Sequence, residues 1–157
     1  MSERDRDAAG RPRNARPRDR LGRPLPRVEG ASPPQDPPAL PPAAALAHAQ
    51  ELLDDDRPFE AHEVLEAVWK STEGPSRNVW RGLAQLCVAL THVRRGNLVG
   101  ATRMFARAAQ NLRDATGHGL AVAELAAWAN GAAAAPAAAA AMPRLPVPTA
   151  QAADDLA

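Results

Sequence analysis

Apolar positions in the middle of the chain recur with the period of an α-helix, and short turn signals divide them into five segments. The spacing predicts helices over residues 41–54, 57–71, 76–95, 98–115 and 120–130. No stretch alternates with period two over a useful length, and the predicted turns are short, which favours antiparallel neighbours. We therefore expect an all-α fold, a compact antiparallel bundle of about five helices made of two helical hairpins and a capping helix.

Turn residues sharpen these boundaries. Asp56 is a good N-cap for the second helix because its carboxylate accepts hydrogen bonds from free backbone N–H groups. Gly96 suits the left-handed position that ends the third helix, and Asn97 can cap the fourth. Gly82 and Gly100 lie inside helical runs, where glycine costs about 1 kcal/mol relative to alanine. We expect them to allow close helix crossings.

An internal repeat of 40 residues supports the hairpin interpretation. Both copies contain a helix, a short turn, and then a small residue followed by apolar residues spaced four apart. The shift places Ala49 on Ala89 and Leu65 on Phe105. This pattern is typical of solenoid hairpins and resembles tetratricopeptide-like hairpins, although the full signature of that repeat is missing.

The two ends of the chain differ from this helical domain, residues 39–131. Residues 1–38, which we call the arm, hold 8 of the 16 prolines and 9 of the 19 basic residues, with almost no apolar periodicity. Residues 132–157, the tail, are rich in alanine and proline in low-complexity order. Because proline removes backbone donors and the arm has little to bury, we expect both ends to be extended or disordered when alone.

Charge and cysteine content limit the function further. The helical domain has 9 basic and 10 acidic residues, a balance of −1, which is a poor surface for duplex nucleic acid. Only the arm, with a balance of +3, could bind nucleic acid. The single cysteine, Cys87, excludes an internal disulfide and a cysteine-based zinc site. No secretory signal or long apolar run is present, so we expect a cytoplasmic protein without a membrane span.

The third predicted helix carries an unusual row of polar residues. It is apolar nearly all round, as is typical of a buried central helix. Its exceptions Arg81, Gln85 and His92 fall within an arc of roughly 40° at about 100° per residue. Buried polar groups need partners, because an unpaired buried charge costs several kcal/mol (roughly 3–5).

The second predicted helix offers these partners. His62 and Glu66, four residues apart, border its apolar face, and Glu63 lies further round. We predict that Arg81 pairs with Glu66 or Glu63, and that the two histidines share the remaining carboxylate and Gln85. The predicted cluster between these helices consists of His62, Glu63, Glu66, Trp69, Arg81, Gln85 and His92.

Three interpretations of this cluster stay open. It can fix the register of the helices, bind a small polar or anionic ligand or a peptide, or carry catalysis. A metal site would combine His62, Glu66 and His92. The chain lacks the His-Glu-x-x-His order of zinc proteases, and an arginine in the same row disfavours a cation, so we expect no metal and no cofactor.

One segment resembles a known family. The run from Glu60 to Trp69, Glu-Ala-His-Glu-x-x-Glu-x-x-Trp, is followed by Arg81-Gly82-Leu83-Ala84-Gln85, His92 and Arg95-Gly96-Asn97. Over residues 46–115 this is similar to the prokaryotic domain-of-unknown-function family 309, which typically has Gln-Gly-Leu-Ile-Gln at the second element. The resemblance implies a compact all-helical fold with no settled activity.

These observations favour a non-enzymatic helical binding or scaffold domain. Its partner would be an unidentified protein or a small polar ligand, and a homo-oligomer is compatible with the pattern. The alternative is a small hydrolase or metal-dependent enzyme that uses His62, Glu66 and His92.

Overall fold

A computed structural model describes residues 8–9, 16–115, 120–139 and 141–148. Within these residues the chain forms α1 (Pro42–Asp54), α2 (Pro58–Ser71), α3 (Arg77–Arg94), α4 (Leu98–Arg113), α5 (Ala123–Ala134) and a short 3-10 helix, η1 (Pro136–Ala138). No strand occurs in this part of the chain, which has only an isolated bridge between Arg18 and Pro24. The predicted all-α fold is confirmed.

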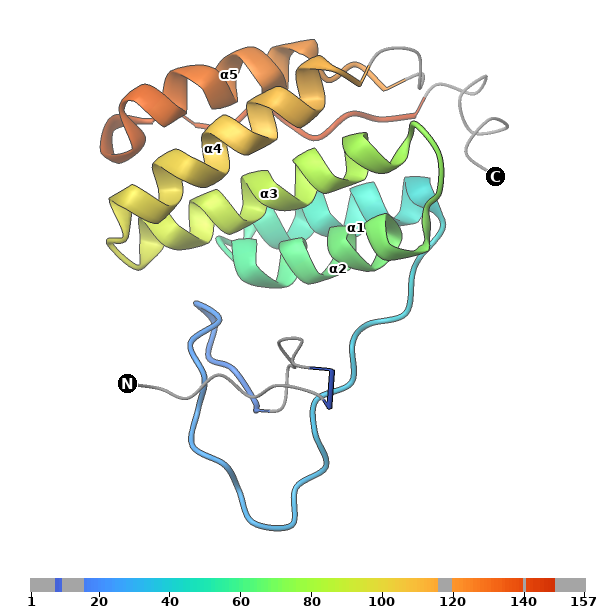
Figure 1. Ribbon diagram of the computed structural model, residues 1–157, viewed down its shortest axis with the longest axis vertical. Coiled ribbons are helices and arrows are strands. Elements are labelled where there is room, and N and C mark those ends of the chain that lie inside the picture. Colours follow the sequence, from blue (N-terminus) through green and yellow to red (C-terminus); the bar gives the residue numbers. More distant parts are fainter. Residues whose placement is uncertain (1–7, 10–15, 116–119, 140, 149–157) are drawn as a thin grey trace.

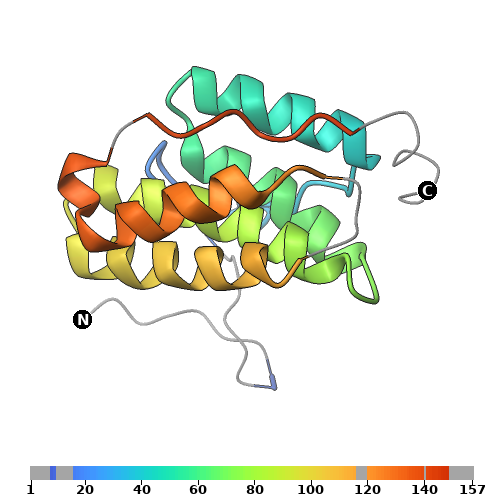
Figure 2. The ribbon, with the colours of Figure 1, turned by 90° about the horizontal axis from the view of Figure 1, so that it is seen from above.

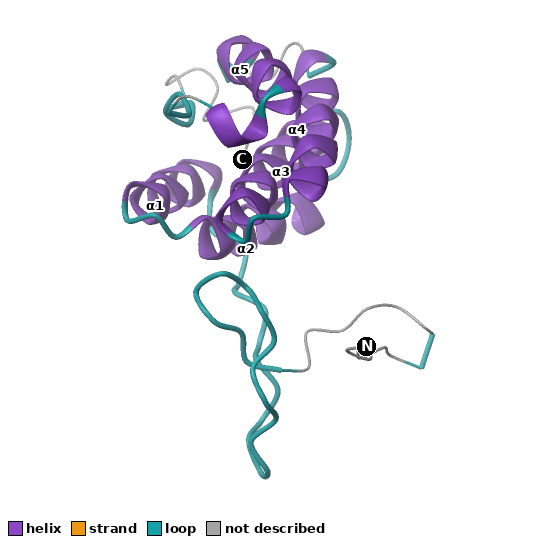
Figure 3. Cartoon of the chain, turned by 90° about the vertical axis from the view of Figure 1, so that its left-hand side faces the viewer, coloured by secondary structure: helices purple, strands orange, loops and turns teal. Residues whose placement is uncertain are grey.

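Each helix packs against the next one in the sequence, so α3 lies between α2 and α4 (Figure 1). α1 packs on the other side of α2, and α5 covers α4 (Figure 2). This order gives the two predicted hairpins, α1–α2 and α3–α4, with α5 as the capping helix. Seen along the bundle, the arm leaves from the α1 and α2 side (Figure 3).

The helix boundaries agree with most of the turn signals. Gly96 has a φ of +72° at the end of α3, and the Asn97 side chain accepts a hydrogen bond from the Gly100 backbone N–H at 3.0 Å. The prediction for Asp56 is wrong, because Arg57 occupies the N-cap of α2. Asp56 has a φ of +56°, and its carboxylate accepts a hydrogen bond from Arg94 Nε at 2.8 Å instead.

Small residues allow the helices to approach closely in the core. Ala61, Ala89 and Ala101 have no exposed surface, and larger side chains fill the space between such positions. The largest fully buried side chains are those of Trp80, Phe105, Leu65, Leu83, Leu86, Leu112, Leu125, Val79 and Cys87. The core cluster includes residues from Ala45 to Leu145 and none from the described part of the arm.

The described part of the tail returns to α1 after α5 (Figure 2). Leu145 is 6% exposed, and its backbone N–H donates to Gln50 Oε1 at 2.7 Å. Arg144 forms an ion pair with Asp54 at 3.3 Å. The described part of the tail therefore adds Leu145 to the core, besides Ala132 at the end of α5. The behaviour expected of residues 1–7, 10–15 and 149–157 lies outside the described residues.

The helices that the structure describes are too short or too polar to cross a membrane.

Gly82 shows how tightly α3 approaches α4. A Cβ at this position would lie 2.7 Å from Leu112 Cγ, and Leu112 is only 2% exposed and so has little room to move. We expect Gly82→Ala to lower the free energy of unfolding by about 1–3 kcal/mol through overpacking, measured by urea denaturation.

Gly131 in α5 is the matched control, since a Cβ there meets nothing within 4 Å. Gly131→Ala should be neutral or stabilising by up to about 1 kcal/mol, because alanine is the better helix former. Equal stability of Gly82→Ala and the wild type would contradict the close approach of α3 and α4.

Candidate binding site between α2 and α3

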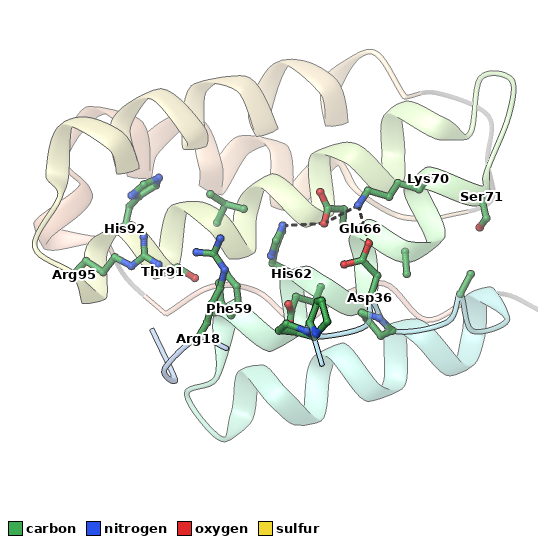
Figure 4. A pocket seen from close by; sticks show the side chains of 17 residues that line it. Arg18, Asp36, Phe59, His62, Glu66, Lys70, Ser71, Thr91, His92 and Arg95 are labelled. Carbon is green, nitrogen blue, oxygen red and sulfur yellow. Dashed lines mark ion pairs between the residues drawn. The ribbon is translucent and has the colours of Figure 1, made fainter. Parts of the chain in front are cut away.

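A cleft of about 890 Å³ lies between α2, α3 and the arm (Figure 4). The helices form its inner wall and the arm forms its outer rim. The arm and the residue that follows it line the cleft with Arg18, Pro33, Pro34, Asp36, Pro37 and Ala39. From α2 and α3 it is lined by Phe59, His62, Glu63, Glu66, Ala67, Lys70, Ser71, Val88, Thr91 and His92, with Arg95 just beyond α3.

Charged and polar side chains cross the middle of this cleft in a row of close contacts. His62 Nε2 lies 3.7 Å from Glu66 Oε2, which lies 3.4 Å from Lys70 Nζ. Lys70 Nζ lies 3.8 Å from Asp36 Oδ2 of the arm (Figure 4). The helical spacing of four residues places the first three on one face of α2. The arm therefore supplies the carboxylate at the end of this row of contacts.

Burial shifts the pKa of two groups on this face. The pKa of His62 is lowered from 6.5, because desolvation of the imidazolium outweighs the attraction of Glu66. The pKa of Glu63 is raised, first by desolvation and then by the negative charges of Glu60, Asp36 and Glu66. These carboxylates repel one another, so this side of α2 favours a cation.

The predicted ion pair of Arg81 with Glu66 or Glu63 is wrong. Arg81 is exposed, and its guanidinium lies 5.7 Å from the centroid of the Trp69 ring. Arg77 lies 5.0 Å from the same ring and donates to the carbonyls of Trp69 and Thr72 at 2.8 and 2.9 Å. The two arginines therefore stack on Trp69, and Arg77 satisfies carbonyls at the C-terminus of α2.

The remaining polar residues of α3 also have other partners. Gln85 Oε1 accepts a hydrogen bond from Asn111 Nδ2 of α4 at 2.7 Å. Asn97 Nδ2 donates to His92 Nδ1 at 3.1 Å, and desolvation and the charge of Arg95 lower the pKa of His92. Periodicity correctly placed Arg81, Gln85 and His92 on one row of α3. Their partners, however, belong to three different elements: α2, α4 and the turn after α3. The single cluster predicted for the seven residues does not form.

Metal binding lacks support in the structure. Among the residues it describes, no group of three His, Cys, Asp or Glu side chains is arranged to hold a metal ion. His62 and Glu66 form a pair, and His92 does not complete it with a third ligand. The donor set expected for the metal-dependent alternative is therefore not assembled.

The arm contacts the helices through residues that the sequence did not single out. Residues 17–25 form a compact turn, which we call the arm turn. Its backbone is closed by hydrogen bonds from Gly22 N–H to the Asp19 carbonyl at 2.8 Å and from Leu25 N–H to the Pro17 carbonyl at 2.8 Å. Among residues 16–38, Gly22 alone is buried, and it packs against Phe59.

Two main-chain carbonyls complete this contact. Arg95 Nε donates to the Leu21 carbonyl of the arm turn at 2.5 Å. In the opposite direction, Arg20 of the arm donates to the Asp55 carbonyl between α1 and α2. The Gly-Arg-Pro sequence at residues 22–24 was the available signal, but it indicated only a turn and not its docking surface.

Fold and cleft together define an all-helical domain of two hairpins and a capping helix. Residues 46–104 match the family described as "Domain of unknown function (DUF309)", which confirms the resemblance over these residues. All seven residues of the predicted cluster lie within the matched segment.

One curated relative is similar over part of the chain. The uncharacterized protein YpuF of Bacillus subtilis (strain 168) is 45% identical over 56 residues, which cover 35% of this chain and 32% of that protein. The chain therefore aligns with about a third of the length of this relative. No solved structure matches the chain.

Titration of His62 tests the electrostatics of the cleft. We expect its pKa, measured by NMR of the imidazole, to lie below 6.5, and Glu66→Gln to lower it further by removing the carboxylate that favours the charged form. Since the folded state prefers the neutral ring, the contribution to stability is present above about pH 6.5 and is lost as the pH falls through the folded pKa. Glu73→Gln, outside the cleft, serves as the control. A pKa above 6.5, or one that Glu66→Gln raises, would contradict this geometry.

Proposed function

We propose that the helical domain is a non-enzymatic binding module that takes an extended polypeptide segment along the outer face of α2 and α3. The observation that carries this proposal is the docking of the chain's own arm on that face. Arg95 binds a main-chain carbonyl of the arm, which any polypeptide presents, and Phe59 packs against its backbone at Gly22.

Charge complementarity supports the same occupant. The arm turn carries Arg18, Arg20 and Arg23, whereas the neighbouring part of the helical domain carries Asp55 and Glu63, among other acidic residues. Attraction between a basic segment and an acidic surface raises the rate of encounter more than the final affinity. A few hydrogen bonds and one packed glycine make a small contact, as is typical of a reversible interaction.

Candidate nucleophiles near the cleft are poorly suited to catalysis. Burial raises the pKa of the Cys87 thiol to about 12, so the reactive thiolate is scarce at neutral pH. The hydroxyl groups of Thr91 and Ser71 donate to the carbonyls of Cys87 and Val68 at 2.8 and 3.0 Å. These arrangements favour binding over covalent chemistry.

A small polar ligand in the cleft is the second candidate. The volume of about 890 Å³ is in the range of small-molecule sites, and side chains of both signs line it. The arm forms the outer rim, so a ligand in the cleft would contact the arm and the helices together. We prefer the polypeptide because the structure already holds one on this face.

Binding of the arm sequence in trans tests the proposed function. A peptide of residues 16–27 is titrated into a chain that lacks residues 1–38, which retains the whole core cluster. We expect saturable binding with one peptide per chain, measured by calorimetry. The full chain should bind the peptide about tenfold or more weakly, because its own tethered arm competes at a high effective concentration.

A scrambled peptide of the same composition is the control for charge alone, and thermal unfolding verifies that the truncated chain is folded. Equal binding of both peptides, or no binding to the folded truncated chain, would contradict the proposal.

Neighbouring arginines allow a test in the full chain. Arg95 binds the arm, whereas Arg94 pairs with Asp56 in the turn between α1 and α2. We expect Arg95→Gln to speed tryptic cleavage between Arg20 and Leu21 by about tenfold. A hydrogen bond from a charged group contributes roughly 1.5 kcal/mol or more, and the cleavage rate follows the population of chains whose arm is undocked. Arg94→Gln should cleave at the wild-type rate. Equal rates for the two variants would contradict docking through Arg95.

A further inference from the structure

The arm turn contacts α2 at a position that only glycine can occupy without strain. Gly22 has a φ of +70°, in the left-handed region that favours glycine, and it is buried. A Cβ at this position would overlap the Phe59 ring and lie 2.7 Å from its Cγ. Any other L-residue here would therefore be strained in its backbone and would collide with the ring.

The same turn also brings an arginine close to this ring. Arg18 Nη1 donates to the Gly22 carbonyl at 2.8 Å, so the side chain closes the turn from four residues before the glycine. Its guanidinium carbon lies 5.9 Å from the Phe59 ring centroid, within the range of a cation–π contact. Arg95 then holds the Leu21 carbonyl next to the glycine.

We infer that Phe59 and Arg95 form a recognition site for a glycine turn preceded by arginine, with the pattern Arg-x-x-x-Gly. The arm turn is its occupant in this chain, and a partner protein that binds here would present the same element. This inference rests on the proposed function and specifies the chemistry of the segment that is bound. Phe59 excludes side chains at the glycine position, and Arg95 reads the backbone carbonyl beside it.

Specificity of this kind follows from shape and not from charge. A basic segment without the glycine would still be attracted to the acidic residues near the turn between α1 and α2. It could not bring its backbone onto the Phe59 ring, so the Arg95 hydrogen bond to the adjacent carbonyl would be lost as well. The site therefore discriminates by a steric collision with the wrong segment.

Two glycines of the arm provide a matched test in the full chain. Gly22 and Gly30 both have positive φ values, +70° and +83°, but a Cβ at Gly30 meets nothing within 4 Å. We expect Gly22→Ala to speed tryptic cleavage between Arg20 and Leu21 by tenfold or more, whereas Gly30→Ala stays within about twofold of the wild type. Each rate is divided by that of the free peptide of the same sequence, and the product that begins at Leu21 is followed by mass spectrometry.

A double-mutant cycle with Phe59→Ala assigns the effect to the ring. Phe59 is outside the core cluster, and thermal unfolding checks that this variant is folded. In the Phe59→Ala background, Gly22→Ala should change the cleavage rate less than it does in the wild-type background, because no ring is left to collide with the new methyl group.

The possible results separate this inference from the proposed function. If Arg95→Gln speeds cleavage and Gly22→Ala does not, the arm docks but the glycine is not recognised, and the inference is overturned. It is also overturned if Gly30→Ala acts as strongly as Gly22→Ala, or if the effect of Gly22→Ala is the same without the ring. If neither Arg95→Gln nor Gly22→Ala speeds cleavage, the docking itself fails, and the proposed function fails with it.

Discussion

The burial of α3 between α2 and α4 is the constraint on which the rest of the structure depends. Close contact on the α4 side requires Gly82, because Leu112 occupies the space that a side chain would need. Polar groups buried on α3 must then find hydrogen-bond partners within the protein. The buried Thr91 hydroxyl, for example, donates to the Cys87 carbonyl of its own helix. The cleft is consequently lined by α2 along most of its inner wall, and α3 contributes residues near its C-terminal end.

Helical periodicity was sufficient to predict the architecture but not the partners of individual side chains. Predicted and observed boundaries of the first four helices differ by at most two residues, and α5 begins and ends a few residues later than expected. The row of Arg81, Gln85 and His92 exists, but a helix packed between two others has two possible neighbours for each position. Spacing on one helix fixes the direction of a side chain relative to its own axis. It does not determine which neighbour lies in that direction.

The docking of the arm could not be predicted for a different reason. Segments rich in arginine and proline bury little apolar surface, which normally leaves them without a stable position. Here the contact uses main-chain carbonyls at Leu21 and Asp55 and the bare backbone at Gly22. None of these is visible as a hydrophobic pattern. Composition alone therefore gives no sign that the described part of the arm lies on the surface of α2 and α3.

Charge and shape have separate roles on this surface. Acidic residues around Glu63 attract any basic segment, but salt screens such attraction and it discriminates poorly. The Phe59 ring acts only at contact distance and responds to a single methyl group, since glycine alone brings its backbone this close. The proposed contact would be weak but selective, because the two effects add for the arm turn and oppose each other for a basic segment that lacks the glycine. If the domain binds a partner as proposed, such a contact could be exchanged for a segment of the same pattern without unfolding the helices, because no described residue of the arm belongs to their core.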